Sequence, residues 1–182
     1  MSKQNKNKAS TMSALLEEKP KRGRPIRAVS RQNVYVALSQ AQKDEIKRLA
    51  SFLPEKVKRA DVPDLAISIL TARLEALRRA LADRNREIPE GVTDLVSLYL
   101  LWDLSLPKQS EEEKWTSIRV SPQQNIELGR AHGTLNAAFG ANRSETFVLG
   151  LALLAAFVEE AELQKTSLTL SQLRQKILDI YL

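Results

Sequence analysis

The chain contains two related segments that lie 82 positions apart. Residues 34–42 align with residues 116–124, and the same offset places Glu45 on Glu127 and Leu53 on Leu135. An apolar pattern with helical spacing then follows in both segments. A recurring unit of strand, helix and helix limits the possible folds more strongly than the amino-acid composition does.

Each segment opens with a short run that has the alternation of a β-strand. Residues 34–38 place three apolar side chains on one face and Tyr35 and Ala37 on the other. Residues 116–120 occupy the equivalent place in the second segment. A strand of this length has unpaired edges and one apolar face, so the two runs are expected to pair with each other.

Helix starts are predicted directly after both strands. Ser39 and Gln42, and likewise Ser121 and Gln124, have the spacing of a capping box, in which the serine oxygen and the glutamine side chain satisfy two backbone amides. Pro122 adds a residue whose φ is already suited to the first helical turn. Each of these helices is apolar on one face only and therefore needs a partner.

A second and more apolar helix is predicted in each segment, followed by a third. The stripes run over residues 67–81 and 147–158, and the added helices cover residues 93–104 and 171–182. We therefore expect a mainly α-helical fold. Two units in one chain, each with an added helix, would share a short antiparallel β-ribbon.

Positive charge is concentrated at the N-terminus. Residues 1–31 hold nine Lys or Arg and two Glu, whereas the rest of the chain holds 19 basic and 20 acidic residues. The expected organisation is a disordered basic arm (1–31), a first unit (32–106), a linker (107–114) and a second unit (115–182). A polyanionic partner would meet the arm first.

Several classes of protein are disfavoured by what the sequence lacks. It contains no cysteine and a single histidine, His132, so thiol nucleophiles, disulfides and cysteine zinc sites are excluded and a catalytic triad is not expected. No phosphate-binding glycine loop is present. The most apolar run, 147–158, is shorter than the roughly 20 residues of a bilayer span. We expect a cytoplasmic protein that is not an enzyme and has no cofactor.

The order of strand, capped helix and buried helix resembles the ribbon-helix-helix family of DNA-binding proteins. The resemblance covers residues 33–81 and 115–160. It implies that two copies interlock, that their strands form a ribbon and that the ribbon enters the major groove. Whether the two copies pair within one chain or between chains, giving a homodimer or higher oligomer, is left open by the sequence.

The resemblance also implies that side chains pointing away from the core face the bases. Arg119 is the best base-reading candidate, because a guanidinium can bond to both O6 and N7 of guanine. Ala37 can donate no hydrogen bond, so the two half-sites are expected to be read unequally, or one half serves mainly as scaffold. The outward residues are Asn33, Tyr35 and Ala37 in the first strand and Ser117 and Arg119 in the second, with Trp115 at its start.

In this family the first amides of the second helix anchor a DNA phosphate. Asn142, Arg143 and Ser144 fit that role in the second unit, with Ser144 expected to cap the helix and Arg143 to supply charge. The second unit is therefore expected to be the tighter backbone clamp.

The first unit fits the same role less well. Pro63 has no amide to donate, and Asp61 would repel a nearby phosphate. Three cations in the preceding loop could compensate, namely Lys56, Lys58 and Arg59.

A separate motif lies in the arm. Lys21, Arg22, Gly23, Arg24 and Pro25 resemble an AT-hook, whose Arg-Gly-Arg-Pro core follows the minor groove of A·T-rich DNA. That groove is narrow and concentrates the negative potential that arginine exploits. The eight or so residues after the motif reach about 26 Å when extended, enough to place it in a groove beside the ribbon.

Together these patterns predict a sequence-specific double-stranded DNA-binding protein with a preference for A·T-rich flanks, which would be nucleoid-associated within the cytoplasm. Its role would be that of a transcriptional repressor or other regulator of bacterial or plasmid type. An accessory factor for plasmid transfer or partition is an alternative with the same chemistry. A third reading is an antitoxin-like or scaffold protein-interaction module, which the near-neutral body of the chain favours.

Overall fold

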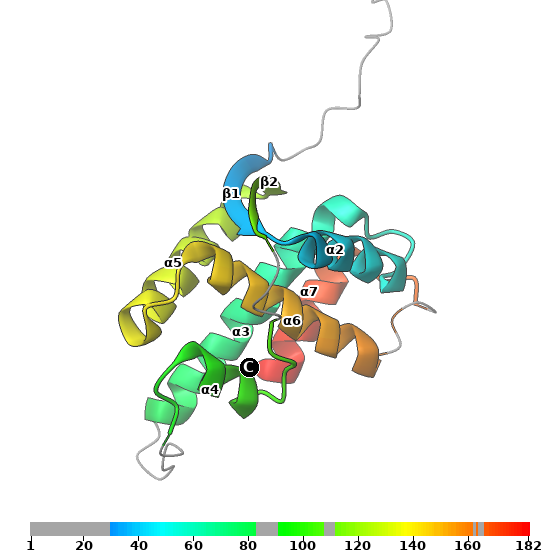
Figure 1. The fold of residues 1–182 in the computed structure, drawn as a ribbon. Coiled ribbons are helices and arrows are strands. Elements are labelled where there is room, and N and C mark those ends of the chain that lie inside the picture. The colour runs from blue at the N-terminus through cyan, green and yellow to red at the C-terminus, as the bar shows by residue number, and fades with distance from the viewer. Residues whose placement is uncertain (1–29, 83–90, 108–111, 162, 164–165) are drawn as a thin grey trace, which may run out of the picture.

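The computed structural model describes residues 30–82, 91–107, 112–161, 163 and 166–182. Most of these residues are helical, and two strands pair as a small antiparallel sheet (Figure 1). The elements in chain order are β1 (Gln32–Leu38), α2 (Gln40–Phe52), η1 (Arg59–Asp61), α3 (Val62–Ala82), α4 (Leu95–Leu101), β2 (Lys114–Val120), α5 (Pro122–Phe139), α6 (Arg143–Ala161) and α7 (Leu170–Tyr181). The expectation of a mainly α-helical fold with a short antiparallel ribbon is confirmed.

The ribbon joins segments that are far apart in the sequence. β1 and β2 pair along their whole lengths, with Tyr35 opposite Ser117 at the centre. Each strand begins two residues earlier than the sequence predicted, because antiparallel pairing aligns the first residues of each strand with the last residues of the other. The two strands are paired within one chain.

One face of the ribbon belongs to the hydrophobic core. A register shift of one residue would turn these apolar side chains toward solvent, so burial fixes the pairing. The buried residues are Val34, Val36, Leu38, Ile118 and Val120.

The capping box predicted at the start of α2 is confirmed. The Ser39 hydroxyl accepts a hydrogen bond from the Gln42 amide at 3.3 Å, and the Gln42 side chain accepts one from the Ser39 amide at 2.8 Å. Ile46 and Leu49 on the inner face of α2 are buried.

The second capping box, predicted at the start of α5, is wrong. The amide of Ser121 donates to Asp64 Oδ1 at 2.9 Å, and the Ser121 side chain makes no capping hydrogen bond. The Asp64 carboxylate of α3 thus accepts the hydrogen bond from the Ser121 amide that the Gln124 side chain was expected to accept. α5 begins instead with Pro122 at its first turn and ends at Gly140, whose φ of 70° suits glycine.

The two long helices α3 and α6 cross at the centre of the molecule, where their backbones approach closely. A Cβ atom added to Gly150 of α6 would lie 2.7 Å from the carbonyl oxygen of Ala66 in α3. Because that neighbour is a backbone atom, it cannot move aside as the end of a side chain can.

Gly150→Ala should therefore lower the free energy of unfolding by about 1 to 3 kcal/mol, the usual cost of overpacking. Urea titration followed by circular dichroism measures the change. Gly133→Ala is the matched control, since a Cβ at Gly133 of α5 meets nothing within 4 Å and alanine favours the helix. Equal stability of the two variants would contradict the close helix crossing.

The predicted third helices differ in length. α7 corresponds closely to residues 171–182, whereas α4 is shorter than residues 93–104. Asp94 caps α4, and the helix is followed by Asp103 with a φ of 52°, a conformation that does not continue a helix. Arg73 of α3 lies against the rings of Trp102 and Tyr181, with its guanidinium 5.8 and 4.4 Å from their centroids. It thereby links the segments that contain α4 and α7.

Candidate nucleic-acid interface

The ribbon stands at one end of the helical body, and its outer face is open (Figure 1). Tyr35 and Trp115 are 63% and 76% exposed. Asn33, Ser117 and Arg119 are exposed as well, while Ala37 is half-buried. All the side chains predicted from the alternation to point outward therefore share this face.

The register arranges the outward side chains as three cross-strand pairs. Asn33 lies opposite Arg119 and Tyr35 opposite Ser117, and Ala37 lies opposite Trp115. One end of the face is thus rich in hydrogen-bond donors and the other is mainly apolar.

Arg119 is available for an external partner. No ion pair or hydrogen bond of its guanidinium is found among the described residues, and its backbone oxygen accepts a hydrogen bond from Arg31 Nη1 at 3.3 Å. By contrast, Arg48 on α2 and Arg130 on α5 lie within ion-pair distance of glutamates. Their charges are partly satisfied within the protein.

The start of α6 lies directly beside β1. Ser144 is buried, and its hydroxyl accepts a hydrogen bond from the amide of Ala37 at 2.8 Å. The capping role predicted for Ser144 belongs to Asn142, whose side chain accepts from the Glu145 amide at 3.0 Å while Glu145 accepts from the Asn142 amide at 2.7 Å. Arg143 is exposed between them, next to the ribbon.

The start of α3 lies beside the end of β2 and is organised differently. Asp64, only 1% exposed, has Arg31 Nη2 at 3.4 Å and Arg174 Nη2 at 3.2 Å, in addition to the Ser121 amide. Arg31 also pairs with Asp61 and donates to the carbonyl of Ala60. The negative charges of Asp61 and Asp64 at the start of α3 are therefore neutralised by arginines of the protein itself.

This buried charge cluster was not foreseen from the sequence. Asp61 was recognised only as unfavourable for phosphate binding, and Arg31 was placed at the end of the basic arm. Arg174 comes from α7, more than 100 residues away, so no local pattern could reveal the contact. The AT-hook-like residues 21–25 lie outside the described residues.

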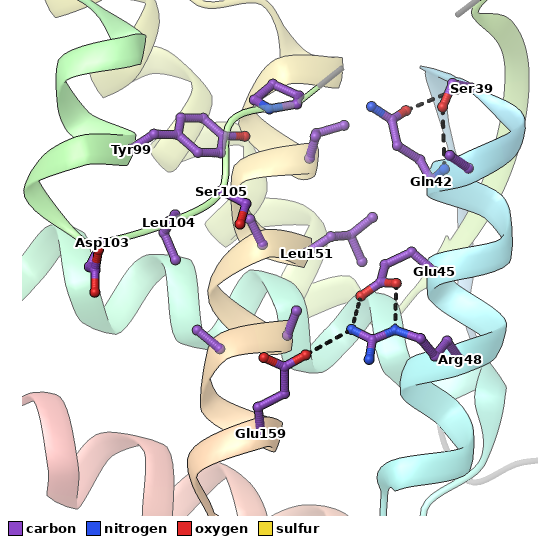
Figure 2. A pocket seen from close by; sticks show the side chains of 16 residues that line it. Ser39, Gln42, Glu45, Arg48, Tyr99, Asp103, Leu104, Ser105, Leu151 and Glu159 are labelled. Atoms are coloured by element: carbon purple, nitrogen blue, oxygen red, sulfur yellow. Dashed lines mark hydrogen bonds and ion pairs between the residues drawn. The ribbon is translucent and has the colours of Figure 1, made fainter.

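A pocket of about 400 Å³ lies between α2 and α6 and is closed at one side by residues that follow α4 (Figure 2). Arg48 donates to both oxygens of Glu45 at 2.7 and 2.8 Å and to Glu159 at 3.1 Å. The hydrogen bonds to Glu45 raise the pKa of Arg48, and burial raises that of Tyr99.

Glu45, Arg48 and Glu159 on the wall of this pocket are thus paired with one another, while Asp103 lines another part of it and alanines of α6 form much of its floor. None of the outward side chains of the ribbon lines it. The ribbon is the better candidate for a functional surface, because its outward side chains are exposed together on one face.

No family model, no curated protein and no solved structure matches the chain. Within the described residues, no helix is both long and apolar enough to cross a bilayer. The same residues contain no group of three or more His, Cys, Asp or Glu side chains that could hold a metal ion.

Proposed function

We propose that the chain is a sequence-specific double-stranded DNA-binding protein whose ribbon enters the major groove. The observation that carries this proposal is the two-faced ribbon, buried on one side and open with polar and aromatic side chains on the other. A major groove is wide enough to admit a two-stranded β-ribbon. In this proposal β1, α2 and α3 form one ribbon-helix-helix unit, and β2, α5 and α6 form the second.

The outer face has suitable chemistry for reading bases. Arg119 can bond to both acceptors of guanine, and Asn33 on the opposite strand can pair with adenine N6 and N7. Tyr35 and Ser117 bring hydroxyls to the centre of the same face.

Backbone contacts would come from the neighbouring helix start and from the arm. Arg143 stands at the first turn of α6, where helix amides and the helix dipole favour an anion. Residues 21–25 would follow an A·T-rich minor groove beside the ribbon. The contact between Arg31 and the Arg119 backbone shows that the described part of the chain begins at the Arg119 end of the ribbon.

A regulator of transcription is the role that this binding mode suits best, because a short duplex site occupied by a compact protein blocks other proteins. An accessory role in plasmid transfer or partition uses the same contacts. A protein-docking role is the second candidate, since the exposed Trp115 and Tyr35 are residues enriched at protein interfaces.

Two arginine substitutions test the proposal. Arg119→Ala should relax specificity at one base pair, with a loss of about 1 to 3 kcal/mol on the preferred site, whereas Arg143→Ala should weaken all duplexes alike. Fluorescence anisotropy with the preferred site and with single-base variants measures both effects.

Arg130→Ala is the control, because it removes the same charge from an exposed position on α5. If neither Arg119→Ala nor Arg143→Ala bound DNA more weakly than this control, the ribbon would not be the DNA-reading surface. A chain that bound no duplex at all would favour the protein-docking role.

A further inference from the structure

We infer that one chain, as a monomer, reads a non-palindromic duplex site in a single orientation. The inference rests on the proposed function and concerns the kind of DNA that this ribbon selects. Both strands of the ribbon come from one chain, so their sequences are free to differ. A ribbon made by two identical chains would present two identical halves to the duplex.

A two-fold axis relates the backbones of the two strands, but it does not relate their outward side chains. The residues differ at all three pairs of equivalent outward positions. Rotation about an axis through the centre of the ribbon exchanges Tyr35 with Ser117, as the register requires. The same rotation exchanges Asn33 with Trp115, and Ala37 with Arg119. The last exchange is the most consequential, because a guanidinium with five N–H groups is replaced by a methyl group.

The buried face of the same ribbon is far more symmetric. Equivalent positions there hold Val36 and Ile118, and Leu38 and Val120, all of which are buried, whereas Val34 is exchanged with the half-buried Thr116. The two strands are therefore alike at the two fully buried pairs, where core packing decides the residue, and unlike at all three outward pairs, where a partner in the groove would decide it. A palindromic site would give one half-site an arginine and leave the equivalent base pair facing Ala37.

The flanks of the ribbon differ in the same way. At the start of α6, Arg143 stands exposed, and the carboxylate of Glu145 in the same turn is bonded to the Asn142 amide. At the start of α3, Pro63 lacks an amide, and Asp61 and Asp64 are already engaged by arginines of the protein. Cations on that side come from the loop before α3, as exposed Lys56, Lys58 and Arg59. The starts of α6 and α3 would therefore contact the DNA phosphates on the two sides of the ribbon unequally.

The test begins with selection of duplexes from a randomised pool by the full chain. We expect a consensus without an inverted repeat and a complex with one chain per duplex, as measured by native mass spectrometry. A palindromic consensus, or two chains per duplex, would overturn the inference while leaving the proposed function intact. No enrichment of any duplex would overturn both.

Orientation can be read directly, because the chain has no cysteine of its own. Gln40→Cys and Gln123→Cys place a single thiol at opposite ends of the ribbon, one after β1 and one after β2. The two positions are matched, since each glutamine is exposed and bonds to an acidic residue four positions later. A tethered iron chelate would then cleave the bound duplex near the thiol.

On the selected site, each labelled variant should cleave one flank only, and the two variants should cleave opposite flanks. Cleavage at both flanks by either variant would show that the chain binds in two orientations, and the inference would be wrong. The triple variant Asn33→Trp, Tyr35→Ser, Ala37→Arg gives both strands the same outward residues. It should select a site with an inverted repeat, and retention of the original consensus would contradict the assigned reading face.

Discussion

Asp64→Ala should lower the free energy of unfolding by about 3 kcal/mol, which is the usual cost of removing one partner from a buried ion pair. Asp64 is almost completely buried and is within ion-pair distance of Arg31 and Arg174. Its loss would remove a negative charge that both guanidiniums contact. It would also leave the Ser121 amide at the start of α5 without its hydrogen-bond acceptor. Urea unfolding followed by circular dichroism provides the measurement.

Two further variants identify the source of the effect. Asp64→Asn keeps an oxygen for the Ser121 amide but removes the charge, so it should fall between the wild type and Asp64→Ala. Asp44→Ala removes a solvent-exposed carboxylate that pairs with Lys47, and it should change the stability little, because exposed ion pairs contribute little. A loss no greater for Asp64→Ala than for Asp44→Ala would show that the cluster is not a structural centre.

Deleting residues 2–29 should weaken DNA binding about 10²- to 10³-fold near physiological salt. This segment carries eight Lys or Arg, and neutralisation of about four phosphates would change the slope of log K against log salt by about 3.6. The deletion stops before Arg31, because the ion pairs of that residue with Asp61 and Asp64 belong to the folded part. Anisotropy titrations across a series of salt concentrations measure both the affinity and the slope.

A second variant separates the effect of the arm's charge from that of its AT-hook-like motif. Gly23→Ala with Pro25→Ala preserves every cation but removes the residues that suit a narrow groove. It should lose the preference for A·T-rich flanks while keeping most of the salt slope. An unchanged affinity and slope after deletion would rule out a role for the arm.

Much of the fold was predictable because its signals are local or periodic. The alternation in residues 34–38 and 116–120 identified both strands, and the spacing of Ser39 and Gln42 identified the start of α2. Repetition at 82 positions indicated which strand pairs with which. The lengths of α4 and of the strands were less accurate, since they depend on the turn at Asp103 and on cross-strand pairing.

The errors share a tertiary origin. The capping box at Ser121 and Gln124 is absent because Asp64, from a distant helix, takes the amide. Ser144 does not cap α6 because its hydroxyl is bonded to the β1 backbone. For the candidate interface, alternation alone gave the outward residues, but only the register shows which of them face each other across the two strands. DNA recognition by that face stays a prediction.

Intrachain pairing of β1 and β2 makes assembly of the ribbon a unimolecular event. Dilution cannot separate its two strands, so the midpoint of thermal unfolding should be independent of protein concentration, unlike that of a two-chain ribbon. The covalent connection also prevents exchange of subunits with related ribbons in the same cell. A molecule built in this way keeps its two dissimilar strands together at the lowest expression levels, when only a few copies are present.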